Sequence, residues 1–195
     1  MQVIMIRHGE TIWSSERRYQ GIFDVPLSEA GRRKLKPAYF SPSRVFVTPL
    51  VRTRETAEIL FPEARQIIVP GLTEMNFGIF EGKNYRELNG NPAYQAWVDS
   101  GCLAACPGGE SKADFSRRVC GAFEELMAGA PAGEDVVIVA HGGTLMAVLE
   151  AFGRPARAYF DWHVGCGCGF RMDAGEWTCG RVLRYLDMVD FKGVF

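Results

Sequence analysis

The chain carries almost no net charge, because 22 lysines and arginines nearly balance 23 aspartates and glutamates over 195 residues. The formal charge of −1 exerts no general attraction on nucleic acid or on an anionic membrane surface. We therefore expect neither as a partner. Any anion that this protein binds must be held by a local cluster of cations.

Long apolar runs are also missing. None approaches the ~20 residues that a transmembrane helix needs, and no charged-then-apolar leader precedes the first apolar segment, since Arg7 already follows it. We expect a cytoplasmic protein without a membrane anchor. The sequence leaves a monomer and a homodimer equally open.

The six cysteines form none of the C-x-x-C pairs that are typical of zinc ribbons and thioredoxin-like sites. Cys166 and Cys168 make a C-x-C pair, and Cys102 and Cys106 are four apart. A chain of this length with 47% hydrophobic residues builds a core without disulfides. We expect small buried or half-buried thiols and no metal site, because His and Cys ligands cannot be grouped by spacing.

What the chain does contain is an alternation of strand-like and helix-like segments. Short apolar runs predict strands at Val3–Ile6, Arg44–Thr48, Gln66–Val69 and Asp135–Ala140. Helical patterns begin at the N-cap Ser28 and cover Pro49–Leu60, Phe115–Met127 and Thr144–Phe152. Two late strands, near Gly167–Met172 and Thr178–Leu186, are predicted to form a hairpin. This order favours an α/β fold, with a mostly parallel sheet and helices on both faces.

The length suits one domain, which we place at residues 1–195. Residues 76–112 are rich in Gly, Asn and Pro and are predicted to form a lid-like insertion rather than a separate domain. Phe77, Phe80 and Tyr85 near this lid, with the four tryptophans, could line an apolar substrate pocket. Plain core packing is the favoured interpretation of these aromatic residues.

Three of the predicted strands end on a basic or imidazole side chain. The first ends at Arg7-His8, the second leads to Arg52, and the strand at Asp135 ends at His141-Gly142. Ligands of open α/β sheets collect beyond the carboxyl ends of the strands. Such a convergence, in a protein of almost no net charge, predicts an anion site at this rim.

Two arginines and two histidines around one rim suit a phosphate group, because guanidinium forks match its oxygens bidentately. An imidazole can also attack phosphorus and form a phosphoenzyme. Neighbouring cations lower the pKa of His8 and keep a ring lone pair free. Glu74 follows the third strand and is predicted to protonate the leaving alkoxide, then to activate water against the phosphohistidine.

Several other charged residues receive secondary interpretations. Glu81 is the second choice for the acid, and Arg54 should point away from the pocket, since it lies about 200° from Arg52 on a helix. Arg18, near Gln20, could reach a second anionic group. His163 has no neighbours of catalytic type in the sequence and is expected to be a surface or structural histidine.

Blocks of sequence then point to a known family. They are Arg7-His8-Gly9-Glu10-Thr11, Tyr19-Gln20-Gly21, Asp24–Ser28, Thr48–Ala57, Leu72–Glu74 with Phe80–Gly82, Pro107–Ser111 and Val139–Gly143. In this order they resemble the histidine phosphatase, or phosphoglycerate mutase-like, superfamily, and they cover most of the chain.

The resemblance implies a three-layer α/β/α sandwich and hydrolysis without a metal or an organic cofactor. It implies that His8 is the phosphorylated nucleophile, that Arg7, Arg52 and His141 hold the phosphoryl group, and that Glu74 is the proton donor.

Further substrate contacts are expected from Gln20, Gly21, Gly142 and Ser14. The family usually has Asn where this chain has Ser14, and a serine hydroxyl still donates a hydrogen bond to a phosphate oxygen, with a shorter reach.

Within the superfamily, the shortness of the chain favours a hydrolase over a cofactor-dependent mutase, which typically carries extra segments that enclose a bisphosphate. The Pro107–Ser111 block, followed by Asp114-Phe-Ser-Arg-Arg-Val119, is similar to α-ribazole phosphatases and to broad-specificity bacterial phosphatases. The expected function is therefore a phosphomonoesterase for a small phosphorylated metabolite, with α-ribazole 5'-phosphate as one candidate. A phosphoglycerate mutase and a phosphatase without a single dedicated substrate stay open.

Two further classes fit less well. A binding module without activity is expected to lack His8 or Glu74, and both are present. A metallohydrolase would place its cation beside arginines that repel it.

Overall fold

The computed structural model describes residues 1–131 and 133–193, so the predicted domain at 1–195 is described except at residues 132, 194 and 195. Its centre is a seven-stranded sheet with the order β3-β2-β4-β1-β6-β7-β5. The strands are β1 (Gln2–Arg7), β2 (Arg44–Val47), β3 (Arg65–Ile68), β4 (Val136–Ala140), β5 (Gly153–Arg154), β6 (Cys168–Asp173) and β7 (Leu183–Asp190).

The sheet is mostly parallel, as predicted. Strand β1 pairs with β4, β2 with β3 and β4, and β5 with β7, all in parallel. Strand β6 is antiparallel to both of its neighbours, β1 and β7.

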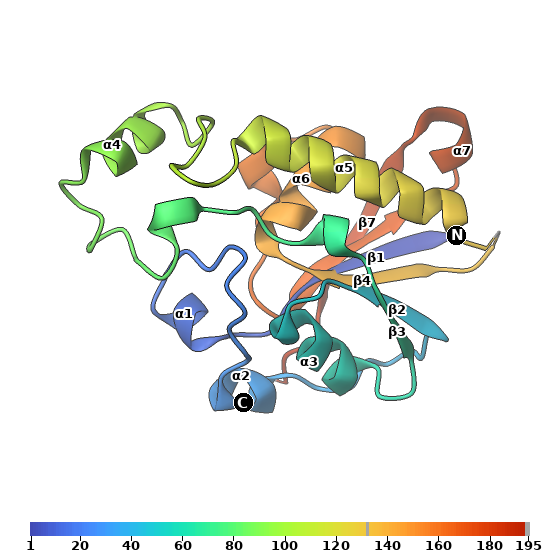
Figure 1. Cartoon of the computed structure of the whole chain (residues 1–195). Coiled ribbons are helices and arrows are strands. Elements are labelled where there is room, and N and C mark those ends of the chain that lie inside the picture. The colour runs from blue at the N-terminus through green and yellow to red at the C-terminus, as the bar shows by residue number, and fades with distance from the viewer. Residues whose placement is uncertain (132, 194–195) are drawn as a thin grey trace.

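Helices cover both faces of this sheet, which makes the three-layer sandwich. Their bounds are α1 (Ile12–Ser15), α2 (Glu29–Lys34), α3 (Val51–Leu60), α4 (Pro92–Asp99), α5 (Lys112–Gly129), α6 (Gly142–Phe152) and α7 (Trp177–Gly180), with 3-10 turns η1 (Pro70–Leu72), η2 (Gly78–Phe80) and η3 (Tyr159–Trp162). Figure 1 shows α5 and α6 on one face and α2 and α3 on the other.

Strand β1 explains why both faces are covered. Its side chains alternate, so that Val3 and Met5 lie in one hydrophobic cluster and Ile4 and Ile6 in another. All four are at most 5% exposed. A strand that is apolar on both faces needs a layer on each side.

Local sequence signals account for several helix starts. The Ser28 hydroxyl accepts a hydrogen bond from the Gly31 N–H and caps α2, as predicted. Asn91 caps α4 in the same way, with Pro92 in the first turn.

The predicted late hairpin is correct in its pairing and wrong in one boundary. Strands β6 and β7 are antiparallel neighbours, but Thr178 lies in the short helix α7 and β7 begins only at Leu183. Trp177 at the start of α7 is buried against Phe123 and Phe152. This packing overrides the β preference of the threonine.

The segment 76–112 carries η2 and α4 and reaches the start of α5. Its Phe80, Leu88, Trp97 and Cys106 are buried and belong to the larger hydrophobic cluster. Figure 1 shows α4 at the upper left of the molecule, away from the sheet. The lid role of this segment stays a prediction.

Candidate active site

The strand register places His8 beside His141. Arg7, the last residue of β1, pairs with Ala140, the last residue of β4. The next residue of each strand is a histidine, and the two rings lie 5.4 Å apart between centroids, at an interplanar angle of 62°. Two residues far apart in the sequence therefore meet because two parallel strands end at the same level.

His8 is held in one tautomer by the backbone. Its Nδ1 lies 2.7 Å from the carbonyl oxygen of Gly9, and a carbonyl only accepts, so Nδ1 carries the proton. The Nε2 atom keeps its lone pair and makes no hydrogen bond within the described residues. The backbone on both sides is anchored, since the His8 N–H donates to Ala140 and the Gly9 N–H donates to the Thr56 hydroxyl.

The pKa of His8 lies well below 6.5, and burial is the largest cause. The positive charges of Arg52 and Arg7 lower it further. The sequence predicted the effect of the cations, whereas desolvation follows from a ring that is only 3% exposed. This lowered pKa favours an uncharged imidazole at neutral pH, with the lone pair of Nε2 free.

Arg52 is fully buried on α3 and points to this site. Its two terminal nitrogens donate to the carbonyl oxygens of Gly21 and Phe23, at 2.7 Å each. Its Nε atom is buried without a partner. Burial lowers the pKa of Arg52 to about 10, while the nearby carboxylate of Glu74 acts in the opposite sense. Arg54 is exposed on another face of α3, as the helical spacing predicted.

Arg7 extends from the end of β1 and donates from Nη1 to the Val164 carbonyl at 2.8 Å. Its Nε is buried and has no hydrogen-bond partner. The same Nη1 lies 3.4 Å from Nε2 of His163. His163 is exposed, as expected, but it contacts a site arginine, which the sequence did not indicate.

Glu74 lies at the amino end of α6. Its carboxylate accepts hydrogen bonds from the backbone N–H groups of Gly143 at 3.1 Å and Met75 at 3.0 Å. A Cβ at position 143 would collide with this carboxylate, so a glycine at this position lets the Glu74 carboxylate lie against the backbone of α6. Glu81, the second choice for the acid, instead accepts from the backbone N–H groups of Phe77 and Ile22.

These side chains surround a cavity of about 310 Å³. Seven of the site residues expected from the sequence line it: Arg7, His8, Gln20, Gly21, Arg52, Glu74 and Gly142. His141 is fully buried beside His8 and is not part of the cavity wall. The structure thus brings together the predicted nucleophile, acid and arginines, and their chemical roles stay predictions.

The outer half of the cavity was not predicted, apart from Arg18 and two of the aromatic side chains. It is lined by Arg18, Tyr19, Met75, Phe77, Trp97, Cys102, Lys112, Met146, Tyr159, Phe160 and His163. Phe80 is buried in the core and Tyr85 is exposed, so only part of the aromatic set near the lid reaches the cavity. No local pattern marks Lys112 or Tyr159, because the docking of α5 and η3 decides where they point.

Both cations of this outer half are paired. Lys112 donates to both carboxylate oxygens of Glu150, at 2.9 and 2.6 Å, and lies 4.6 Å above the centre of the Tyr159 ring. Arg18 pairs with Glu16 and Glu87. Arg7 and Arg52 form no ion pair within the described residues, although the carboxylate of Glu74 is near Arg52. The unpaired cations of the cavity are therefore these two arginines.

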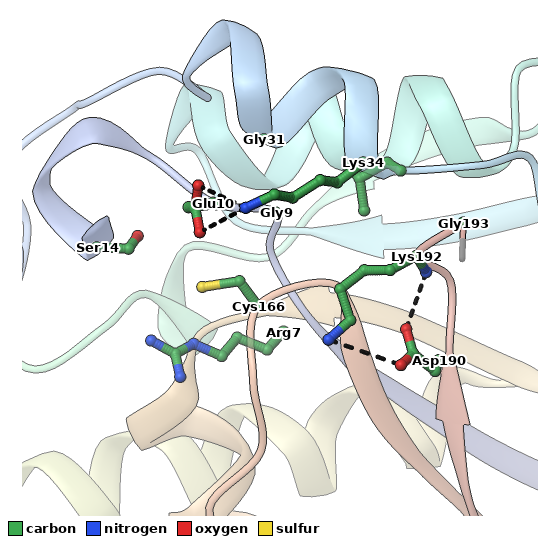
Figure 2. A pocket seen from close by; sticks show the side chains of 11 residues that line it. Arg7, Gly9, Glu10, Ser14, Gly31, Lys34, Cys166, Asp190, Lys192 and Gly193 are labelled. Carbon is green, nitrogen blue, oxygen red and sulfur yellow. Dashed lines mark hydrogen bonds and ion pairs between the residues drawn. The ribbon is translucent and has the colours of Figure 1, made fainter. Parts of the chain in front are cut away.

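Ser14 does not reach this cavity. Its hydroxyl is hydrogen bonded to Thr11 and to the Gln20 side chain. Ser14 instead lines a second cavity on the other side of Arg7, where Figure 2 shows the ion pairs of Glu10 with Lys34 and of Asp190 with Lys192. Its phosphate contact stays a prediction that needs these hydrogen bonds to rearrange.

All six cysteines are free thiols, and Cys102 is one of the cavity residues. Five of them are buried or half-buried, as predicted, but Cys179 is exposed, so the prediction is wrong for that residue. Over residues 1–131 and 133–193, no group of three or more His, Cys, Asp or Glu side chains is arranged to hold a metal ion. No helix in those ranges is both long and apolar enough to cross a membrane.

Burial of His8 and His141 predicts how stability depends on pH. Both pKa values lie well below 6.5 in the folded protein, whereas the unfolded chain takes up these protons near pH 6.5. Below that pH, protonation of the unfolded chain lowers the free energy of unfolding, by up to about 1.4 kcal/mol per pH unit for each histidine. Urea unfolding should show full stability above about pH 7.5 and a falling midpoint toward pH 5.5.

The variant His141→Gln separates the effect of histidine burial from the titration of carboxylates, which the variant and the unmodified protein share. We expect its stability to fall less steeply between these two pH values. An unchanged pH slope would mean that His141 is already protonated in the folded protein.

Comparisons with known proteins agree on one family. A model of the histidine phosphatase superfamily (branch 1) matches residues 3–183. The 2,3-bisphosphoglycerate-dependent phosphoglycerate mutase 2 of Gloeobacter violaceus is 34% identical over 161 residues, which cover 75% of this chain and 73% of that protein.

Solved structures show the same fold. The alpha-ribazole phosphatase of Shigella flexneri has a TM-score of 0.81 at 26% identity and covers 100% of both chains. The protein TTHB049 of Thermus thermophilus has a TM-score of 0.70 at 32% identity, covering 97% of this chain and 99% of that chain.

Proposed function

The chain belongs to the histidine phosphatase superfamily, and from this premise we propose that it is a metal-independent phosphomonoesterase that works through a phosphohistidine at Nε2 of His8. One observation carries the proposal. The bond from Nδ1 to the Gly9 carbonyl fixes the tautomer, and burial with Arg7 and Arg52 keeps the ring neutral, so Nε2 is a prepared nucleophile.

In the first step the Nε2 lone pair forms a bond to phosphorus while the bond from phosphorus to the ester oxygen breaks. The leaving oxygen takes a proton from the carboxyl group of Glu74. Arg7 and Arg52 stabilise the negative charge on the transferred group, since each presents a buried Nε–H without another partner.

In the second step a water molecule attacks the phosphohistidine and gives a proton back to Glu74. Inorganic phosphate leaves, and His8 recovers its lone pair. The two guanidinium groups repel a metal cation, so we assign the charge stabilisation to the arginines.

The lining of the outer half of the cavity suits a substrate whose leaving alcohol is uncharged, so that the phosphate carries the only negative charge. Its walls are mainly aromatic and apolar, and Lys112 and Arg18 are already paired with carboxylates. A phosphoester of an uncharged, ring-bearing alcohol fits this surface. One such compound is α-ribazole 5'-phosphate, whose leaving alcohol is a neutral nucleoside, and the likeness to the Shigella flexneri alpha-ribazole phosphatase supports it.

A phosphoglycerate mutase is the second candidate, and the 34% identity to the Gloeobacter violaceus mutase favours it. Such an enzyme uses the same phosphohistidine but returns the phosphoryl group to a carboxylate-bearing substrate. Formation of 2-phosphoglycerate from 3-phosphoglycerate, in the presence of a bisphosphate primer, would establish the mutase and contradict the phosphatase proposal.

The test compares benzyl phosphate with 4-carboxybenzyl phosphate, which differ by one negative charge on the leaving group. The enzyme, dialysed against EDTA, should hydrolyse the uncharged ester with the higher kcat/KM. Glu150→Gln removes the counter-charge of Lys112 and should shift the ratio of the two kcat/KM values about five- to tenfold toward the carboxylate, as expected for a loss of about 1 kcal/mol in a half-exposed pair.

Glu124→Gln is the matched control, because its ion pair with Arg181 lies outside the cavity. It should leave the ratio unchanged. Loss of activity on dialysis would instead indicate a metallohydrolase, and a preference for the carboxylate in the unmodified enzyme would contradict the assigned leaving group.

A further inference from the structure

Two buried threonines stand behind His141. The Thr48 hydroxyl lies 2.9 Å from Nε2 of His141 and 2.9 Å from the hydroxyl of Thr53. All three side chains are fully buried. The other ring nitrogen of His141, Nδ1, is buried and has no hydrogen-bond partner. This unpaired atom belongs to a ring beside His8, where the proposed function places the phosphoryl group.

Each threonine hydroxyl has a single proton, so only two arrangements place a proton in both the Thr53–Thr48 contact and the Thr48–His141 contact. In the first, Thr53 donates to the backbone carbonyl of Leu50 at 2.8 Å or of Thr48 at 3.1 Å. Thr48 then donates to Thr53, and the Nε2–H of His141 donates to Thr48. The Nδ1 atom of His141 then presents a lone pair, which would repel the oxygens of a phosphoryl group.

In the second arrangement both hydroxyl groups rotate. Thr53 donates to Thr48, and Thr48 donates to Nε2 of His141. The proton of the ring is then on Nδ1, which becomes a hydrogen-bond donor. Phosphoryl oxygens only accept, so only this arrangement lets a neutral His141 bind them.

We propose that Thr48 and Thr53 are positioning residues that set the tautomer of His141, and that phosphoryl binding selects the arrangement in which Thr48 donates to Nε2. The inference rests on the proposed function, because it assumes a phosphoryl group beside His8. Neither threonine lines the cavity, so Thr48 acts through His141, and Thr53 acts through Thr48. Burial and the nearby arginines lower the pKa of His141, which supports a neutral ring that must choose one tautomer.

The test reads the tautomer directly. Long-range ¹H–¹⁵N spectra of ¹⁵N-histidine-labelled protein distinguish protonated from unprotonated ring nitrogens, and the chain has three histidines to assign. With saturating orthovanadate, His141 should be protonated at Nδ1 and unprotonated at Nε2. Protonation at Nε2, or at both nitrogens, in the vanadate complex would overturn the proposal and leave the phosphatase intact.

Two substitutions at Thr48 add a kinetic readout. Thr48→Val keeps the shape but lacks the donor, and it should lower kcat/KM about ten- to a hundredfold, less than the loss of a direct transition-state donor. Thr48→Ser keeps the hydroxyl and should stay within about threefold of the unmodified enzyme. Equal loss in both variants would show a packing role and contradict the proposal.

The spectra keep the inference testable even if Thr48→Val fails to fold, since they need only the unmodified protein. Vanadate that changes no histidine resonance would contradict the phosphoryl site itself, and with it the proposed function.

Discussion

Replacing His8 with alanine is expected to abolish turnover of benzyl phosphate, with a loss of about 10⁴-fold or more, as is typical when a covalent nucleophile is removed. The rapidly quenched unmodified enzyme should carry labelled phosphate from the substrate on one histidine, stable to base and labile to acid. The His8→Ala protein should carry none. His141 should not substitute, because its Nε2 contacts Thr48 and the proposed arrangement places the ring proton on Nδ1, and Nε2 of His163 lies 3.4 Å from Nη1 of Arg7.

Inorganic phosphate binding is the control for this variant. Arg7 and Arg52 keep their backbone carbonyl contacts without His8, so calorimetry should still detect phosphate at the site. A His8→Ala protein that binds phosphate and still hydrolyses the ester would contradict the phosphohistidine mechanism. Label on a residue other than a histidine would contradict it equally.

Replacing Glu74 with glutamine is expected to trap the phosphoenzyme. 4-Nitrophenolate leaves without much help from an acid, so the first step with 4-nitrophenyl phosphate should stay fast. The second step lacks the base that activates water, and general acid–base catalysis is worth about 10²–10⁴-fold. Stopped-flow absorbance should therefore show a burst of one nitrophenolate per site, followed by slow turnover. With benzyl phosphate both steps should slow, and the burst should disappear.

Glu81→Gln is the matched comparison, because Glu81 was the other candidate acid and does not line the cavity. Its carboxylate supports the turn at Gly21 by accepting the Ile22 N–H. Burial raises the pKa of Glu81, which by itself would be the mark of a general acid, so position is the deciding criterion. We expect a loss of less than about tenfold and no burst. A burst in Glu81→Gln but not in Glu74→Gln would reverse the assignment.

Much of the inner site could be predicted because it depends on strand ends. Short apolar runs define where β1, β2 and β4 stop, and parallel strands in register bring the residues that follow to one rim. The choice of Arg52 over Arg54 needed only the helical repeat. The late strand boundary failed at Thr178, because buried packing of Trp177 decides the conformation there.

Other features depend on contacts between distant parts of the chain. The partner of Lys112 is 38 residues away, and the partner of His141 is 93 residues away. Ser14 illustrates the same limit, since its hydroxyl is hydrogen bonded to Gln20 rather than directed into the site cavity. No periodicity or motif spacing carries information about such pairs.

The sequence by itself determined the α/β fold, through its local hydrophobic patterns, and the family, through the resemblance of its motif blocks. Residue types at the strand ends also predicted which side chains handle phosphate. The tertiary structure alone decided which nitrogen of His8 is free, which tautomers His141 can adopt, and that the outer cations are neutralised. The physical reason is that charge, protonation and hydrogen bonding depend on burial and on neighbours a few ångströms away, such as the Gly9 carbonyl at His8, Thr48 at His141 and Glu150 at Lys112.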